Sequence, residues 1–238
     1  MKSGVNIGRL NIFIDETGEF GLGRRSAKFY GVSLVFHEHT TDISSQLQGL
    51  SRRFADLNFS GMVHMGDLIN GHGEYENMGI KERKKIYSAL FRFSSSVKMK
   101  YSSIIFQKRF ADDVGKLANS LKLLLRNLIE ENLAYFQQFN KIIVYYDGGQ
   151  KILARIIDEE FGTLPSYVRK ADFDHTEKKL FQVADMLTFL DKLIYKYEHR
   201  MKLSPSEKRF FNTKEILRVR YELRRKQLVK KAPFRVLI

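Results

Sequence analysis

A short apolar run that ends in acids is the feature that most constrains this chain. Residues 10–14 are apolar except for one asparagine, and Asp15, Glu16, Thr17 and Gly18 follow at once. Such a run predicts a buried strand. Carboxylates at its end lie between walls of low dielectric constant, where an unpaired negative charge is costly. The arrangement is useful only if a cation or a proton is held there, so we take Asp15 and Glu16 as candidates for function.

The whole composition limits the classes of protein that this chain can belong to. Its 238 residues, 43% of them hydrophobic, are enough for one large domain or for a domain with an appendage. No cysteine is present, which excludes disulfides and thiolate metal sites. The sequence shows no membrane span and no apolar leader, so we expect a soluble, cytoplasmic protein with no membrane partner.

The charge of the chain points to a polyanionic partner. Lys and Arg number 41 against 27 Asp and Glu, which leaves a net charge of +14. Nucleic acid is the first candidate partner and an acidic membrane surface the second. The plainer alternative is that the charges only keep a surface solvated.

Apolar periodicity predicts an alternation of helices and strands. A strand at 29–36 is expected to pair with the first strand as a hairpin. Further along we expect a helix at 42–57 begun by Asp42, a loop at 58–79, a helix at 80–94, a strand at 99–107, a helix at 110–138, a strand at 141–146, a helix at 150–161 and a strand at 166–171. The strand–helix–strand order from 141 to 171 is typical of a parallel unit. The predicted fold class is therefore α/β with a mixed sheet.

Two further acids occupy positions like that of Asp15. Asp147 follows a second apolar strand, and Asp185 lies in the middle of an apolar helix predicted over 174–199. A buried carboxylate in such a helix must be paired, hydrogen-bonded or metal-bound. Lys178 and Gln182 share its helix face, seven and three residues before it.

Adjacent strands and a helix packed over them can bring the three acids to one point. Three carboxylates suit Mg²⁺ or Mn²⁺. Two such ions about 4 Å apart can clamp both oxygens of a phosphoryl displacement. Simpler readings remain open: Asp15 in a turn, Asp147 as a helix cap, and Asp185 in a salt bridge with Lys178.

Three segments of this sequence resemble a known family. Residues 12–18, 145–148 and 182–187 look like the family catalogued as domain of unknown function 3800, over roughly 9–198. Its members resemble the ribonuclease H-like fold. The resemblance implies metal binding by an acid on the first strand, one on the fourth strand and one on a late helix: Asp15, Asp147 and Asp185.

A fourth acid, which ribonuclease H carries on its first long helix, has no clean match in this chain. That leaves the identity of a fourth ligand open. Glu16, His64 and Asp67 are the alternatives.

The last segment is strongly basic. Residues 200–238 hold 13 Lys and Arg but three acids, a net charge of +10. We interpret them as a helical extension of about 205–229 on a ribonuclease H-like domain of residues 1–199. Its apolar face would dock on the domain or on a second copy of the chain, through Phe210, Leu217, Tyr221 and Leu228.

The sequence thus predicts a metal-dependent nuclease or a related phosphodiester-cleaving enzyme. Asp15, Asp147 and Asp185 would hold Mg²⁺ or Mn²⁺, and Glu16 would orient water. Four residues are predicted to contact substrate, or in part to brace Asp185: Lys178, Gln182, Arg24 and Arg25. The alternative is a catalytically silent nucleic-acid-binding module. DNA and RNA, and endo- and exonucleolytic action, all remain open.

Overall fold

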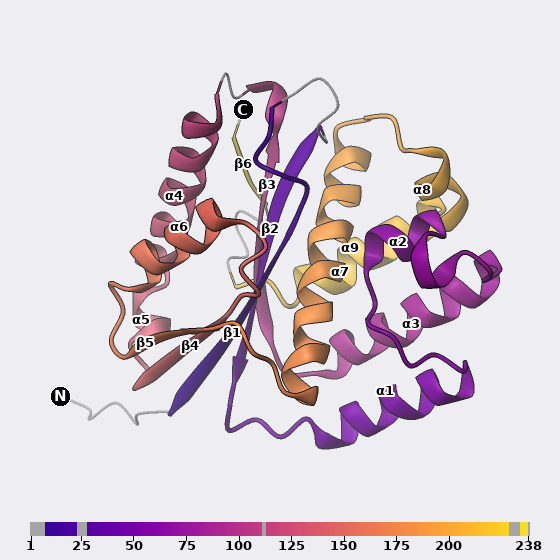
Figure 1. Cartoon of the computed structure of the whole chain (residues 1–238), viewed down its shortest axis with the longest axis horizontal. Helices are drawn as coiled ribbons and strands as arrows, with labels where there is room; N and C mark the ends of the chain where they lie inside the picture. The colour runs from indigo at the N-terminus through magenta and orange to yellow at the C-terminus, as the bar shows by residue number, and fades with distance from the viewer. Residues whose placement is uncertain (1–7, 23–27, 111–112, 229–233, 238) are drawn as a thin grey trace.

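The structure, a computed structural model that describes residues 8–22, 28–110, 113–228 and 234–237, is built on a six-stranded mixed sheet (Figure 1). The strand order is β5-β4-β1-β2-β3-β6, which places β1 inside the sheet. Strand β2 is antiparallel to both of its neighbours, and the other pairs are parallel. The bounds are Arg9–Thr17 for β1, Phe29–Glu38 for β2, Lys100–Gln107 for β3, Lys141–Tyr145 for β4, Tyr167–Lys170 for β5 and Phe234–Leu237 for β6.

Helices cover both faces of this sheet, which confirms the predicted α/β class. In Figure 1, α4, α5 and α6 lie on one side and the remaining helices on the other. The bounds are Ser44–Asp56 for α1, Met65–Asn70 for α2, Ile80–Ser96 for α3, Val114–Glu131 for α4, Leu133–Phe136 for α5, Lys151–Phe161 for α6, His175–Glu198 for α7, Pro205–Phe210 for α8 and Thr213–Arg224 for α9. Among the described residues, no helix is both long enough and apolar enough to cross a lipid bilayer.

The pleat of β1 divides its side chains between two cores. Ile12 and Ile14 belong to the core beneath α4 and α6, whereas Phe13 belongs to the core beneath α7. Phe13 stacks on Tyr145 of β4 with ring centroids 4.8 Å apart. Because side chains alternate along a strand, Asp15 follows Phe13 onto the α7 side, and a side chain one residue on faces the other way.

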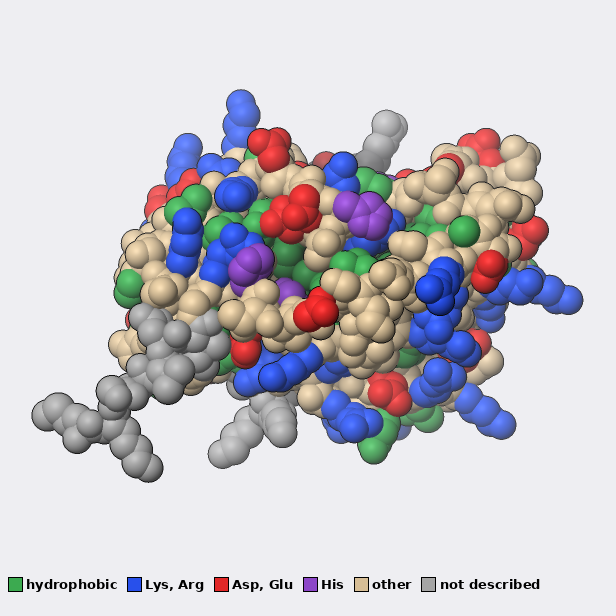
Figure 2. All heavy atoms as spheres, turned by 90° about the horizontal axis from the view of Figure 1, so that it is seen from below, with side chains coloured by type: hydrophobic (Ala, Val, Ile, Leu, Met, Phe, Trp, Pro, Cys, Tyr) green, Lys and Arg blue, Asp and Glu red, His purple; other side chains and the backbone are tan. Residues whose placement is uncertain are grey.

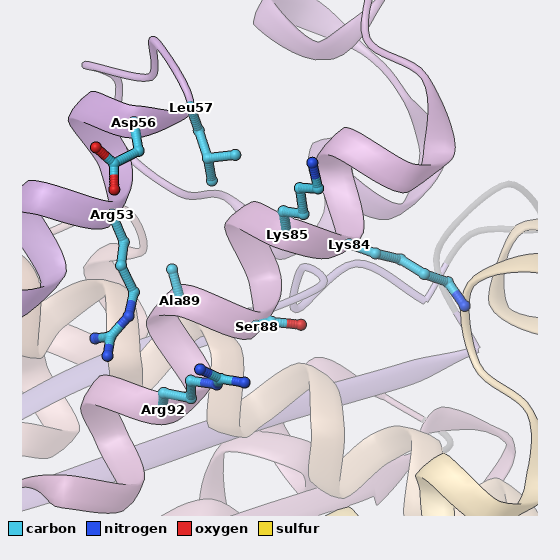
Figure 3. Close-up of a pocket in the computed structure, with 8 residues that line it drawn as sticks. All are labelled: Arg53, Asp56, Leu57, Lys84, Lys85, Ser88, Ala89 and Arg92. Atoms are coloured by element: carbon cyan, nitrogen blue, oxygen red, sulfur yellow. The ribbon is translucent and has the colours of Figure 1, made fainter.

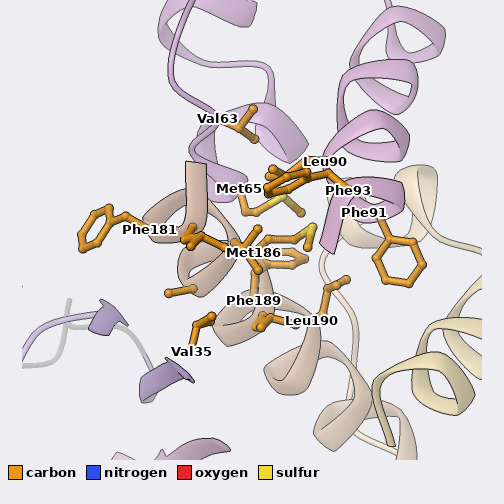
Figure 4. Close-up of a cluster of buried hydrophobic side chains, with 14 of the residues drawn as sticks. Val35, Val63, Met65, Leu90, Phe91, Phe93, Phe181, Met186, Phe189 and Leu190 are labelled. Atoms are coloured by element: carbon orange, nitrogen blue, oxygen red, sulfur yellow. The ribbon is translucent and has the colours of Figure 1, made fainter. Parts of the chain in front are cut away.

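Helix α7 packs directly on β1 and β2 and is buried around most of its circumference. Figure 4 shows Met186 of this helix beside Met65, in a cluster of buried apolar side chains that also contains Leu190 and Phe93. Close approach to the sheet depends on Gly31 of β2, where an added Cβ would lie 3.0 Å from Cγ2 of Thr188. The lack of a side chain at this position therefore lets α7 settle over the edge that carries Asp15.

The structure corrects three of the predicted elements before β4. Asp42 does not cap α1: the N-cap is Ile43, and the Asp42 carboxylate instead accepts the backbone N–H of Ser44 at 2.9 Å. The segment 58–79, expected as a loop, contains α2 and a 3-10 turn. The predicted helix 110–138 is divided at Asn132, whose side chain donates to the backbone oxygen of Leu128. Side-chain competition for backbone groups explains this break.

The basic segment forms two short helices rather than one long helix. The first ends at Phe210, and Asn212 caps the second, because its side chain accepts the backbone N–H of Glu215 at 2.9 Å. Helix α8 lies against α2 and α9 against α7, and β6 pairs with β3. The boundary predicted at residue 199 stays a prediction.

The face of α9 that docks on the domain differs from the predicted one. Its buried side chains are Ile216, Val219 and Leu223, whereas Leu217 is 43% and Tyr221 66% exposed. The expected docking of Leu217 and Tyr221 on the domain is therefore wrong. Self-association through this helix stays a prediction.

Candidate functional site

Asp15 and Asp147 lie at the same edge of the sheet. Strands β1 and β4 are parallel, and their last paired residues are Phe13 and Tyr145. Each acid lies two residues beyond that pair. Asp15 is still within β1 and half-buried, whereas Asp147 is exposed and accepts the backbone N–H of Gly149 at 3.0 Å. The parallel pairing therefore brings together two acids from opposite halves of the chain.

Asp185 lies on α7 above this edge. One turn later, the hydroxyl of Thr188 lies 3.5 Å from the backbone oxygen of Asp15, which fixes the height of the helix over the strand. The Oδ2 atom of Asp185 accepts the backbone N–H of Met65 at 2.7 Å. Burial raises the pKa of the Asp185 carboxyl to about 6, while the Met65 hydrogen bond acts to lower it.

The acids of this edge act on one another electrostatically. Burial raises the pKa of Asp15 well above its usual value, and the negative charge of Asp185 is the next cause. Glu16 and Asp147 raise it further. Four carboxyls thus share one electrostatic field, and their mutual repulsion is what a divalent cation would relieve. We call Asp15, Glu16, Asp147 and Asp185 the acid cluster.

Glu16 is held from the opposite face of β1. The Tyr146 hydroxyl donates a hydrogen bond of 3.1 Å to Oε1 of Glu16 and itself accepts the backbone N–H of Gln150 at 2.7 Å. The other carboxylate oxygen, Oε2, is buried without a hydrogen-bond partner. Burial raises the pKa of Glu16 to about 7. An added Cβ at Gly149 would lie 3.0 Å from Glu16 Oε1 and 3.4 Å from Asp147 Oδ1, so both carboxylates flank this glycine.

The donor chemistry of the acid cluster fits a hard divalent cation. It offers carboxylate oxygens alone, one of them the unpartnered Oε2 of Glu16. In the part of the chain that the structure describes, no group of three or more His, Asp or Glu side chains is close enough to hold an ion together. An ion would have to draw these side chains inward. His64 and Asp67 of the α2 region are exposed but near enough for their charge to act on Asp185.

The predicted substrate residues are placed less favourably. Lys178 is exposed two turns before Asp185, and seven helical residues span about 10 Å. Gln182 is 1% exposed, and neither its amide nitrogen nor its oxygen has a hydrogen-bond partner. It therefore does not brace Asp185 by a direct hydrogen bond. Arg24 and Arg25 lie outside the described residues.

Two side chains at this edge escaped the sequence analysis. Lys192 lies two turns after Asp185, and its Nζ lies 3.5 Å from Oγ1 of Thr17 at the end of β1. The spacing that singled out Lys178 applies equally to Lys192, so the signal was present. Tyr146 had no such signal, because an aromatic residue within an apolar strand is indistinguishable from a core residue.

Comparisons with known proteins add little to this picture. No family model and no curated protein matches the chain. The fold is similar to a solved structure of the PCNA:RNase HII complex from Archaeoglobus fulgidus, with 14% identity and a TM-score of 0.37. That match covers 88% of this chain and 87% of the other. Similarity this low supports no functional inference, so function must rest on the residues themselves.

Proposed function

We propose that this protein is a divalent-metal-dependent nuclease or a related phosphodiester-cleaving enzyme that acts at the acid cluster. The proposal rests on one observation: the carboxyls of Asp15 and Asp185 are near enough for the charge of Asp185 to raise the pKa of Asp15. Two acids from opposite ends of the chain are half-buried at one sheet edge, and each has a raised pKa. Perturbed carboxyls grouped in this way are more common at functional sites than elsewhere.

Asp15, Asp147 and Asp185 are the proposed ligands of Mg²⁺ or Mn²⁺. Such an ion, when bound, polarises a phosphoryl oxygen and lowers the pKa of bound water. Glu16 is suited to a separate task. Tyr146 holds one oxygen of its carboxyl, the other is unpartnered, and its pKa of about 7 suits proton transfer near neutral pH. Glu16 would therefore orient and deprotonate the attacking water.

The placement of the acids also supports the resemblance to the ribonuclease H-like fold. Asp15 lies on the first strand, Asp147 just after the fourth and Asp185 on a late helix. This is the distribution that the resemblance implies. Family membership and the finer fold assignment remain proposals.

A cleavage assay with matched variants tests the proposed function. With Mn²⁺, the protein should cleave a mixed panel of single- and double-stranded DNA and RNA. Asp15→Asn or Asp185→Asn should lower the rate at least about 100-fold, as loss of electrostatic stabilisation does in other enzymes. Glu130→Gln, which changes an exposed acid on α4, is the control and should cleave normally. Full cleavage by both site variants would contradict the proposal.

Metal binding is tested separately from cleavage. An ion that binds only the folded chain raises its stability by mass action, by about 2.7 kcal/mol at 100 times the dissociation constant. Mn²⁺ should therefore raise the melting temperature of the wild type and of Glu130→Gln. The same shift in Asp15→Asn and Asp185→Asn would remove these residues from the metal site.

A catalytically silent nucleic-acid-binding module is the second candidate, and a basic groove between α1 and α3 favours it. The groove has a volume of about 430 Å³ and is lined by four cations and one acid: Arg53, Lys84, Lys85, Arg92 and Asp56 (Figure 3). Lys84 pairs with Glu215 at 3.6 Å, whereas no ion pair of the other three occurs among the described residues. Figure 2 shows Lys and Arg side chains over both halves of the face seen from below, with one group of them on the right.

The two candidates predict different variants to matter. If the chain only binds nucleic acid, Arg53→Gln with Arg92→Gln should weaken binding. Substitutions in the acid cluster should then leave binding unchanged, and neither the wild type nor any variant should cleave nucleic acid.

A further inference from the structure

A second pocket opens beside the acid cluster, at the end of β1. It has a volume of about 310 Å³ and is bounded by the end of β1, the start of β2, the last turns of α7 and the segment after α7. Among the described residues that line it, none is an acid and four are lysines: Lys28, Lys192, Lys196 and Lys202. We call it the lysine pocket. Thr17, two residues after Asp15, contributes a hydroxyl to its wall.

Two of these lysines are fixed by the fold. Lys196 forms a 2.7 Å ion pair with Glu207, a buried residue of α8. Glu207 is itself oriented by the capping box at Ser204, because it accepts the backbone N–H of that residue at 2.7 Å. Lys192 is half-buried, with its Nζ 3.5 Å from Oγ1 of Thr17. The pocket is therefore a built feature rather than a chance meeting of mobile side chains.

Positive charge in the pocket is not balanced. Glu207 neutralises Lys196, but Lys28 and Lys202 are exposed and no ion pair of either occurs among the described residues. Burial lowers the pKa of Lys192 and the neighbouring Lys196 lowers it further, whereas the charges of Glu207 and Asp185 act to raise it. An anion bound from outside the chain would stabilise the charged form of these lysines.

We propose that the lysine pocket binds a phosphate group of the nucleic-acid strand next to the phosphodiester at the acid cluster. Lysine ammonium groups bind phosphate as point charges, and the Thr17 hydroxyl adds a donor. The Phe29 side chain forms an apolar part of the wall and carries no oxygen that would repel a phosphate. The position of this phosphate relative to cleavage rests on the proposed function, but phosphate binding itself does not.

The pocket also defines a path for the strand, from the lysine pocket to the acid cluster. The acid cluster repels phosphate unless a cation is bound, whereas the lysine pocket attracts it without metal. Lys192 lies two helical turns beyond Asp185, so the two subsites follow one another along α7. A strand held by its neighbouring phosphate would thus be delivered to the acids.

Binding without metal tests the proposal in the full-length chain. Fluorescence anisotropy would follow a 3′-labelled ten-nucleotide thymidine strand in EDTA at several salt concentrations. Lys28→Gln with Lys202→Gln removes two exposed pocket charges. Lys98→Gln with Lys141→Gln removes two exposed charges that precede β3 and begin β4, at the opposite edge of the sheet. This control double variant carries the same net charge as the pocket double variant.

The pocket double variant should lose affinity by about tenfold, which is the scale of lost charge-assisted hydrogen bonds. Its log–log salt slope should be shallower by about 0.7 for each single-strand phosphate contact removed. The control should keep the affinity within about twofold, since its lysines make no such contact. Equal losses in the two double variants would overturn the proposal, and so would an unchanged affinity of the pocket variant.

The same experiment, run with 5′-phosphorylated and 5′-hydroxyl strands, shows which phosphate is bound. If the pocket binds a terminal phosphate, the wild type should bind the 5′-phosphorylated strand more tightly than the 5′-hydroxyl strand. The pocket double variant should then bind the two strands equally. If the pocket binds an internal phosphate, the wild type should bind the two strands equally. The pocket double variant should then lose the same amount of affinity for each strand. Lysine-dependent binding by a protein that cleaves nothing with Mn²⁺ would uphold the pocket and contradict the nuclease.

Discussion

The backbone N–H of Met65 donates a 2.7 Å hydrogen bond to the carboxylate of Asp185. Met65 begins α2, and the first N–H groups of a helix have no partner within it. Asp185 satisfies one of them and gains a donor that offsets part of its burial. The orientation of this acid and the position of α2 therefore depend on each other. The segment expected as a loop at 58–79 is thus part of the support of the acid cluster.

Asp15→Asn should stabilise the metal-free protein at pH 8. Burial and three neighbouring acids raise the pKa of Asp15, so its ionised form is disfavoured in the folded state. A group with a raised folded-state pKa stabilises the fold at low pH and loses this contribution as pH rises. The melting temperature in EDTA should rise by about 2–4 °C, the shift that 1 kcal/mol produces in a chain of this size. An unchanged or lower value would show that Asp15 is not under repulsion.

Gln182→Met should separate stability from function. The Gln182 side chain is buried with both polar atoms unpartnered, and a buried unsatisfied polar group costs about 1–3 kcal/mol. An apolar side chain of similar length should recover part of that cost, measurable by urea denaturation. If Gln182 contacts substrate, nucleic-acid affinity or cleavage should fall in the same variant. Higher stability with unchanged binding and cleavage would assign it no role.

Asp191→Asn should change the pH dependence of stability. Asp191 lies on α7 with no exposed surface, and burial raises the pKa of its carboxyl to about 7. Hydrogen bonds from Ser103 and Tyr101 of β3 act to lower the pKa, and Glu198 acts to raise it. The folded state therefore keeps a proton that the unfolded chain loses, and stability falls as pH rises from the unfolded value toward 7.

The substitution should consequently raise the free energy of unfolding at pH 8 by up to about 4 kcal/mol, since the pKa is raised by about three units and one unit corresponds to 1.36 kcal/mol. The substitution should have little effect on stability at pH 4, where the folded protein carries a neutral side chain at position 191 whether it is Asp or Asn. Chemical denaturation of wild type and variant at the two pH values gives the comparison. A gain of the same size at both would rule out titration of Asp191 as the cause.

Truncation after His199 should destabilise the remaining domain. Phe211 packs against Phe189 of α7 and against Tyr87 of α3, with ring centroids 6.2 and 5.3 Å apart. Removal of α8 and α9 would expose this aromatic surface, and burial of one large apolar side chain is worth about 1.5–3 kcal/mol. Size-exclusion chromatography and thermal melting should show aggregation or a lower melting temperature. A monomeric fragment that keeps the melting temperature of the full chain would show that the domain folds without residues 200–238.

Sequence periodicity was enough for the elements that are locally determined. The run at 10–14 formed β1, the order from 141 to 171 formed a parallel unit, and Asp174 with Glu177 formed the capping box of α7. These features depend on alternation, chain order and a three-residue spacing, all of which are present within a short segment. They were sufficient to place Asp15 and Asp147 at one edge.

Tertiary packing alone decided which side chains surround those acids. Helical spacing marked Lys178 as a neighbour of Asp185, but the direction of α7 along β1 put Lys192 at the edge instead. In the same way, α9 buries Ile216 rather than Leu217, because the docking face depends on what lies beneath the helix. A periodic pattern specifies a face of an element, whereas its neighbour is set by the packing of segments distant in sequence.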